Sequence, residues 1–325
     1  MSALEVEALT IAVPGPARPV EVVRGASLRL ERGEMVGLVG ESGSGKSLTA
    51  LAILGLLPPA ARVSSGRVLL DGRDLLALSE RALREVRGGA IGLVFQEPLS
   101  ALNPVLTVGR QLAEALQAHR RIGRRERAAE ARDLLELVGL PERTAASYPH
   151  QLSGGQRQRV LLTLSLASRP GFLLADEPTT ALDVTVQAQI LDLLASLRAR
   201  LGLGVLLVTH DLAVVAESCD RAYVMYAGQI VEEGPVPALF GSPGHPYTAG
   251  LLAALPRLGR PAGRGTLPAV PGQVADPRRL PPGCAFHPRC PRAASRCRSE
   301  QPEVVELAPR HRCRCFFPEP GVPGR

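Results

Sequence analysis

One octapeptide constrains this chain more than any other feature. Residues 40–47 fit the pattern G-x-x-x-x-G-K-[ST], reading Gly40-Glu41-Ser42-Gly43-Ser44-Gly45-Lys46-Ser47. An apolar run at residues 35–39 predicts a buried strand before the motif, and a helical pattern follows at 46–57. The glycines let the backbone wrap around phosphate groups, and the helix N-terminus adds partial positive charge. Lys46 then reaches the β- and γ-phosphates and Ser47 ligates Mg²⁺, so the motif predicts a nucleoside triphosphatase.

The basic residues single out the same motif. The chain has 38 Lys and Arg residues and a formal net charge of +7, yet Lys46 is its only lysine. Arginine in place of lysine, with abundant Ala, Gly and Pro, indicates a coding bias toward G and C rather than a nucleic-acid surface. Aromatic residues make up 3% and Trp is absent, which also argues against a stacking platform for single-stranded nucleic acid.

Length and composition divide the chain into two parts. With 325 residues, 45% hydrophobic and 21% charged, it has room for two folded units. Of its 29 prolines, 18 lie after residue 234, so the last 91 residues differ in kind from the rest. The N-terminal residues do not resemble a signal peptide, and no run reaches 18 apolar residues. We therefore expect a cytoplasmic location, where clustered cysteines are not explained by disulfides.

Strand and helix patterns alternate along the chain, which predicts a mostly parallel sheet covered on both faces. A strongly helical stretch at 100–170 interrupts this order and reads as an inserted subdomain. The predicted strands are short ones within 5–30, then 35–39, 68–70, 91–95, 172–175 and 205–208, with a hairpin at 222–225 and 229–232; helices are predicted at 46–57, 108–139, 155–168 and 184–200.

Two neighbouring acids follow one of the buried strands. Asp176 and Glu177 come directly after the apolar run 172–175. In a doubly wound sheet the carboxyl ends of the strands face the phosphate loop. Asp176 suits the metal, and Glu177 suits the orientation and activation of an attacking water.

A third motif narrows the class of protein. The sequence Leu152-Ser153-Gly154-Gly155-Gln156 opens a helix that Ser153 is able to cap, and its glycines leave the N-terminus open to an anion. Together with the motifs beside it, this segment resembles the signature sequence of ATP-binding cassette (ABC) ATPases. Gln96, Ala181-Leu182-Asp183 and His210 then follow in the order that the family shows.

The resemblance to ABC ATPases covers about residues 5–240. It implies an α/β P-loop (RecA-like) core with an antiparallel β subdomain and an inserted helical subdomain at about 98–170. It also implies that two such domains meet head to tail, with ATP bound between the phosphate loop of one and Ser153 to Gln156 of the other. By similarity Gln96 and Asp176 help to hold Mg²⁺, Glu177 is the general base, His210 contacts the γ-phosphate, and Asp183 belongs to the D-loop. One departure concerns the aromatic that commonly stacks on adenine, because the corresponding region is Ile11-Ala12-Val13 and Val13 would take its place.

Longer segments resemble one importer subfamily. They are residues 95–104 (FQEPLSALNP), 148–151 (YPHQ) and 175–191 (ADEPTTALDVTVQAQIL). They are similar to the dipeptide, oligopeptide and nickel importers, and most to the subunit that pairs with a second, similar ATPase. The resemblance implies peptide import at the cytoplasmic face of the cell membrane, with two transmembrane permease subunits, an extracytoplasmic binding protein and no nucleic acid. A nickel chelate or another small solute as cargo, and more remotely a soluble ABC ATPase acting on DNA or ribosomes, remain as alternatives.

A cysteine-rich tail completes the sequence, within an extension expected at 241–325. Four cysteines lie at Cys284, Cys290, Cys297 and Cys315, a spacing unlike that of paired C-x-x-C zinc units. Four thiolates in a segment poor in core residues are able to fold it around a metal. The subfamily resemblance points to a [4Fe–4S] cluster, with zinc or unligated thiols as alternatives. Cys313 competes with Cys315 for the fourth position, whereas His287 and His311 are expected to be plain loop residues.

Overall fold

The computed structural model describes residues 2–16, 18–95, 101–120, 122–180, 182–255 and 270–318. The chain divides into two compact units, each built from separate segments. Unit 1 comprises residues 1–4, 30–35 and 70–207, and unit 2 comprises residues 5–29, 36–69 and 208–325. The expected boundary at residue 240 stays a prediction. No helix in the described ranges is long and apolar enough to cross a membrane.

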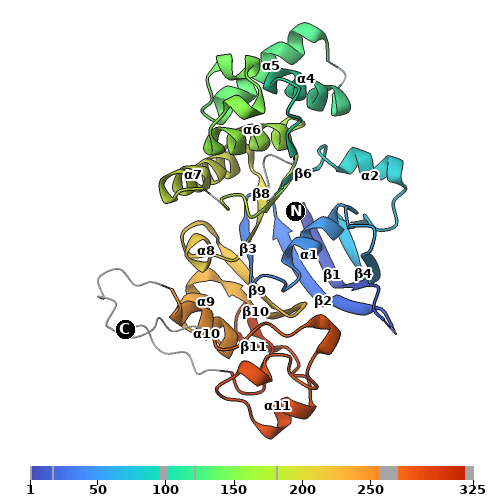
Figure 1. Ribbon diagram of the computed structural model, residues 1–325, viewed down its shortest axis with the longest axis vertical. Coiled ribbons are helices and arrows are strands. Elements are labelled where there is room, and N and C mark those ends of the chain that lie inside the picture. Colours follow the sequence, from blue (N-terminus) through green and yellow to red (C-terminus); the bar gives the residue numbers. More distant parts are fainter. Residues whose placement is uncertain are drawn as a thin grey trace. The chain divides into compact units, whose positions relative to one another are not determined.

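Unit 1 combines the short strand β5 (Arg73–Asp74) and the strands β6 (Ile91–Val94), β7 (Phe172–Asp176) and β8 (Gly204–Thr209) with the helices that follow and separate them (Figure 1). The strand order is β8-β7-β6, and β6 pairs with β7 in parallel from Ile91 opposite Phe172 to Val94 opposite Ala175. The elements are β5 (Arg73–Asp74), α2 (Glu80–Val86), β6 (Ile91–Val94), α4 (Val108–His119), α5 (Arg124–Leu137), η1 (Glu142–Ala146), η2 (Pro149–Gln151), α6 (Gly154–Leu166), β7 (Phe172–Asp176), α7 (Val184–Leu201) and β8 (Gly204–Thr209).

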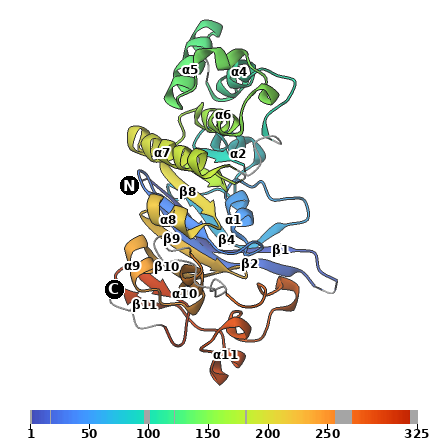
Figure 2. The same cartoon turned by 60° about the vertical axis from the view of Figure 1, so that its left-hand side comes forward.

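The helical stretch of unit 1 lies between β6 and β7 along the chain. Helices α4, α5 and α6 pack on one another, as Figure 2 shows. The sequence predicts one helical run over 108–139, but the structure divides it: α4 ends at His119 and α5 begins at Arg124, after Gly123 as N-cap. This agrees with the predicted helical content, whereas a separate subdomain at about 98–170 stays a prediction.

Unit 2 carries the phosphate-loop motif and the whole C-terminal region. One of its sheets has the order β11-β12-β10-β9-β3, and another has the order β2-β1-β4. The elements are β1 (Ala3–Val13), β2 (Val20–Glu31), β3 (Met35–Val39), α1 (Lys46–Ile53), β4 (Arg62–Leu70), α8 (Leu212–Ser218), β9 (Arg221–Tyr226), β10 (Gln229–Pro235), α9 (Val236–Gly241), α10 (Pro246–Ala253), η3 (Pro277–Arg279), η4 (His287–Arg289), α11 (Ser295–Ser299), β11 (Val305–Ala308) and β12 (His311–Cys313).

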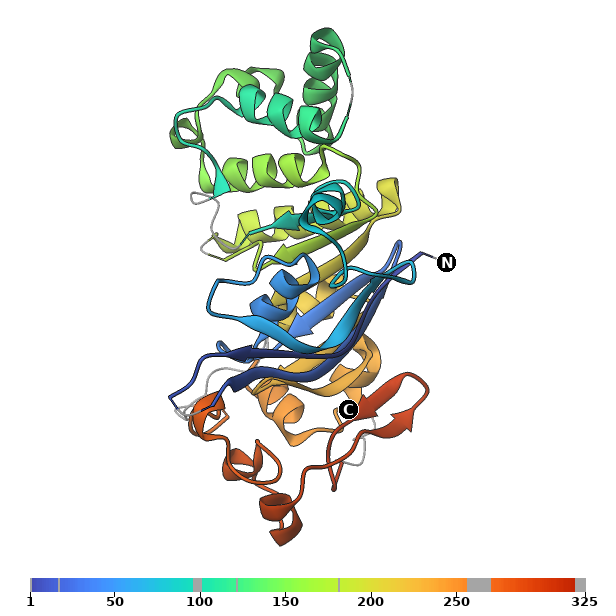
Figure 3. The same ribbon diagram turned by 90° about the vertical axis from the view of Figure 1, so that its right-hand side faces the viewer.

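The predicted hairpin is present and carries the C-terminal strands. Ala227 and Gly228 join β9 to β10 with φ of 44° and 84°, the left-handed conformations of a tight hairpin turn. Strand β12 pairs antiparallel with β10, and β11 pairs with β12; Figure 3 shows this pair in red beside the orange hairpin. His311 therefore lies in a strand and is buried, so the expectation of a loop residue was wrong. The pairing joins residues nearly 80 positions apart, which no local pattern indicates.

Candidate functional site

The phosphate loop follows the most buried strand of unit 2. All five residues of β3 are buried, and the chain then turns at three glycines with positive φ, namely Gly40, Gly43 and Gly45. A Cβ on Gly40 would lie 2.1 Å from the Met225 carbonyl oxygen, so this position has no room for a side chain. The fold therefore requires glycine at position 40, both because the backbones pack closely and because φ is positive.

Helix α1 opens at the loop, as predicted. Gly45 is its N-cap and no side chain caps the helix. The side chain of Lys46 is buried, and its Nζ donates to the carbonyl oxygens of Gly40 at 2.7 Å and Glu41 at 3.0 Å. The lysine thus lies across its own loop. The helix ends at Ile53 rather than at residue 57, because Gly55 takes a left-handed φ of 61° and closes the C-terminus.

Two residues of unit 2 bear on the other family expectations. His210 is exposed in the segment between β8 and α8, directly before Asp211, which caps α8. Val13, the expected substitute for an adenine-stacking aromatic, is the last residue of β1 and is half-buried. Gln96, expected to help hold Mg²⁺, lies outside the described residues, as does Ala181.

The two predicted acids end β7 in unit 1. Every residue of β7 is buried, including Asp176. Glu177 follows with a φ of 47°, a conformation that costs a non-glycine residue on the order of 1–3 kcal/mol. Its carboxylate accepts a hydrogen bond from the Thr180 hydroxyl at 2.8 Å. Parallel pairing with β6 places the end of that strand, just before Gln96, at the same edge of the sheet.

The predicted signature segment has the expected helix start. Ser153 is the N-cap of α6 and accepts from the Gln156 amide at 3.3 Å, while the Gln156 side chain accepts from the Ser153 amide at 3.0 Å. This reciprocal capping box orders the first turn of the helix. Asp183 is the N-cap of α7, and its side chain accepts from the Val186 amide at 2.9 Å.

The structure also shows a contact that the sequence did not predict. A Cβ on Gly155 would lie 2.6 Å from Val186 Cγ1, and one on Gly154 would lie 3.3 Å from Leu182 Cδ2. The glycines of the signature segment thus admit the segment around Asp183 at close range. The sequence assigned these glycines to an open helix N-terminus and, by resemblance, to the ATP site of a partner, and did not indicate this packing.

The cysteines of the tail converge on one small pocket of unit 2. Cys284, Cys290, Cys297 and Cys315 line a cavity of about 20 Å³ together with His245 and three phenylalanines, Phe286, Phe316 and Phe317. Burial first, and also the charges of the other three thiols, raise the pKa of the Cys315 thiol to about 11. In the described ranges, however, no group of three or more His, Cys, Asp or Glu side chains is arranged to hold a metal ion.

Cys313 occupies a different environment from the other four tail cysteines. It is buried in β12, and the position of a Cβ on Gly244 would lie 3.3 Å from its Sγ. Burial, and then the charge of Glu232, raise the pKa of the Cys313 thiol to about 12. Cys313 does not line the four-cysteine pocket, so the structure favours Cys315 as the fourth member of the set.

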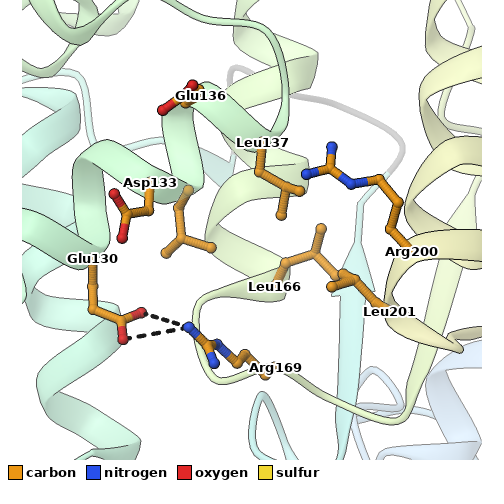
Figure 4. A pocket seen from close by; sticks show the side chains of 9 residues that line it. Glu130, Asp133, Glu136, Leu137, Leu166, Arg169, Arg200 and Leu201 are labelled. Carbon is orange, nitrogen blue, oxygen red and sulfur yellow. Dashed lines mark hydrogen bonds and ion pairs between the residues drawn. The ribbon is translucent and has the colours of Figure 1, made fainter.

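A larger pocket in unit 1 contains none of the predicted site residues. It has a volume of about 570 Å³ and lies among residues of α5, α6 and α7, with an apolar wall of leucines and an ion pair from Arg169 to Glu130 at 3.4 Å (Figure 4). Because none of the sequence motifs contributes a residue to its lining, we do not assign a function to this pocket.

Two family models match the chain, one in its N-terminal part and one in its C-terminal part. Residues 23–180 match the family described as "ABC transporter", and residues 231–297 match "Oligopeptide/dipeptide transporter, C-terminal region".

Curated relatives resemble the chain along nearly its whole length. It is 48% identical to a probable peptide ABC transporter ATP-binding protein of Sinorhizobium fredii, over 96% of this chain and 94% of that protein. It is 44% identical to the dipeptide transport ATP-binding protein DppD of Escherichia coli, over 98% and 97%. It is also 50% identical to the oligopeptide transport ATP-binding protein OppD of Mycobacterium tuberculosis, over 97% of this chain but only about half of that protein (52%).

Solved structures resemble the cassette portion. The ATP-binding cassette MJ0796, in a dimeric post-hydrolysis state bound to ADP and Pi, is 31% identical with a TM-score of 0.65, over 72% of this chain and 98% of that one. The protein cbiO1 of Clostridium perfringens is 28% identical with a TM-score of 0.64, over 73% and 90%. These likenesses establish an ABC ATPase fold for most of the chain.

Proposed function

The chain belongs to the ABC transporter ATP-binding proteins that carry an oligopeptide/dipeptide C-terminal region, and we propose that it is the ATP-hydrolysing subunit of a peptide importer. The phosphate loop is the observation that carries this proposal, since a fully buried strand leads into a glycine turn crossed by the only lysine. The names of the relatives support peptides as the cargo, with a nickel chelate or another small solute as the alternative.

Roles for individual residues follow from the chemistry of the groups. Residues 40–47 would hold the phosphates of ATP, with Ser47, Asp176 and Gln96 at Mg²⁺ and Glu177 as the base that takes the proton of the attacking water. Ser153 to Gln156 would serve the site of a partner ATPase, and His210 and Asp183 would respond to the γ-phosphate. The solved dimer of MJ0796 supports such a two-cassette arrangement.

The proposed assembly places the chain at the cytoplasmic face of the cell membrane. Its partners would be a second, similar ATPase, two transmembrane permease subunits and an extracytoplasmic binding protein. Within this assembly the helical segment 98–170 would form the inserted subdomain, and residues 241–325 the importer-type extension. Relatives that are named as parts of peptide transporters support this arrangement.

Replacement of Lys46 by Arg tests the ATPase directly. Arg retains the charge, but its planar guanidinium does not fit a loop where a compact ammonium reaches two carbonyls. We expect Lys46→Arg to lose MgATP turnover by at least about a hundredfold, while Arg198→Lys on α7 keeps the wild-type rate. An ATP-dependent rate that survives Lys46→Arg would contradict the assigned phosphate site.

We further propose that the four-cysteine pocket binds a metal, and that this metal is a [4Fe–4S] cluster. Four thiols lining one small, largely apolar cavity support this, because such clusters take four cysteine ligands. The described side chains do not form a ready metal-holding group, so the ligands would have to draw together on loading. Zinc remains the alternative.

Cys315 lines the pocket and Cys313, two residues earlier, does not, so the two positions provide a test and its matched control. Iron, sulfide and zinc are measured in protein purified without oxygen, for wild type, Cys315→Ser and Cys313→Ser. We expect about four iron and four sulfide per chain in the wild type and in Cys313→Ser, and a loss in Cys315→Ser. Zinc in their place would identify the alternative, and a wild type without metal would refute the proposal.

A further inference from the structure

The C-terminal region contacts the phosphate loop at Glu41. The backbone N–H of Glu41 donates to the Tyr247 hydroxyl at 2.9 Å. Its carboxylate accepts two hydrogen bonds from Arg289, at 2.7 Å from Nη1 and 3.0 Å from Nη2. All of these residues belong to unit 2, and Arg289 lies 248 positions from Glu41 along the chain.

Glu41 also connects these contacts to the lysine of the loop. Its backbone carbonyl accepts from Lys46 Nζ at 3.0 Å, beside the 2.7 Å bond to the Gly40 carbonyl. Glu41 therefore contacts the C-terminal region through its N–H and its carboxylate, and contacts Lys46 through its carbonyl oxygen. A displacement of Glu41 would displace the acceptor that fixes the ammonium group.

Arg289 is fixed on its own side by the fold of the tail. Its Nε donates to the Pro271 carbonyl at 2.7 Å and its Nη2 to the Val270 carbonyl at 3.1 Å. The guanidinium lies over the rings of Tyr226 and Phe286, 5.7 Å and 5.9 Å from their centroids. Its side chain is 5% exposed, whereas that of Glu41 is 31% exposed.

This arrangement is more than a surface ion pair. A bidentate guanidinium–carboxylate pair with a buried guanidinium is directional and among the stronger polar contacts in proteins. The hydrogen bonds with Glu41 raise the pKa of Arg289 above its ordinary value. Arg289 also immediately precedes Cys290, so the fold of the four-cysteine pocket and the orientation of Arg289 depend on the same segment.

We propose that Arg289 is a positioning residue of the phosphate loop, through which the folded C-terminal region sets the affinity for nucleotide phosphates. This inference rests on the proposed binding of ATP at residues 40–47. Because coupling between two sites is reciprocal, nucleotide bound at the loop must in turn stabilise the segment that holds Arg289. A contact that only docked the tail would change stability and leave nucleotide affinity untouched.

The dissociation constant for Mg²⁺-bound AMP-PNP, a non-hydrolysable ATP analogue, tests the affinity arm on the full chain. We expect Arg289→Met to weaken binding about tenfold and Arg289→Lys less, since lysine keeps the charge and loses the fork. Arg298→Met, at an exposed arginine of the same tail, is the matched control and should bind like the wild type.

A double-variant comparison locates the effect at the ion pair. Glu41→Gln/Arg289→Met should bind no more weakly than the weaker of its two single variants, because both remove the same contact. Binding by Arg289→Met within twofold of the wild type would show that Arg289 only docks the tail. A wild type without nucleotide affinity would instead refute the proposed function itself, so the two failures are distinguishable.

Hydrogen exchange on the wild-type chain tests the reciprocal arm without any substitution. We expect the amides of residues 284–297 to exchange several-fold more slowly when Mg²⁺–AMP-PNP is bound. Unchanged exchange at saturating nucleotide would contradict the coupling, even if an Arg289 variant failed to fold.

Discussion

At the residue scale, Glu177 has a local conformation that suits the role of base proposed for it. It lies at the end of a buried strand with a φ of 47°, and the Thr180 hydroxyl holds its carboxylate at 2.8 Å. A glutamate kept in a strained conformation by its surroundings is a common feature of functional sites. The neighbouring Asp176 is buried, and under the proposed function it would serve at Mg²⁺.

Replacement of Glu177 by Gln separates binding from turnover. The amide oxygen can still accept from Thr180, so the backbone conformation should persist while the base is lost. We expect nucleotide affinity near that of the wild type and a MgATP turnover lower by about a hundredfold or more. Asp192→Asn, at an exposed acid of α7, controls for the loss of one negative charge. Turnover near the wild-type rate in Glu177→Gln would show that another group is the base.

Individual residues also show what the sequence could and could not predict. The phosphate loop, the cap by Ser153 and the acids after β7 were predictable, because each depends on neighbours within a few positions. The contact of Arg289 with Glu41 was not, since nothing local links residues so far apart. The sequence placed Cys315 rather than Cys313 in the four-cysteine set. In the structure Cys315 lines the pocket, whereas Cys313 is buried in β12 and does not line it.

At the scale of elements, two helix starts in unit 1 are interlocked. Ser153 caps α6 and Asp183 caps α7, and the space left by Gly155 admits Val186 from the first turn of α7. Because helix caps and close packing coincide here, the first turns of α6 and α7 constrain each other's positions. A substitution in the first turn of one helix is therefore expected to disturb the first turn of the other.

A pair of complementary substitutions tests this interlock. Gly155→Ala should lower the free energy of unfolding by about 1–3 kcal/mol, because the new methyl group meets Val186 at 2.6 Å. In a Val186→Ala background the added methyl group has room, so Gly155→Ala/Val186→Ala should have nearly the same free energy of unfolding as Val186→Ala alone. Gly241→Ala, where a Cβ would meet nothing within 4 Å, is the control. Chemical denaturation measures all of these variants, and a double variant as unstable as the sum of its singles would exclude a direct clash.

Across the whole molecule, the C-terminal region is tied into unit 2 rather than appended to it. The buried carboxylate of Glu232 in β10 accepts from the amides of Gly244 and His245 at 2.6 Å and 3.0 Å. The His311 ring nitrogen lies 2.7 Å from the same carboxylate, which fastens β12 to the hairpin. Around it Tyr226, Tyr247 and Phe286 form an aromatic cluster that continues the core. The C-terminal region therefore shares its core with β9 and β10 of unit 2.

The most direct test of peptide-importer function is a tagged pull-down of the full chain from gently solubilised native membranes, analysed by mass spectrometry. We expect two multi-spanning subunits and a second, similar ATPase in stoichiometric amounts, and ligand analysis of any co-isolated binding protein should release peptides. An untagged strain serves as the control. Recovery of the chain from the soluble fraction with DNA or ribosomes, or with no membrane subunit, would contradict the transport function and leave only the proposed ATPase chemistry.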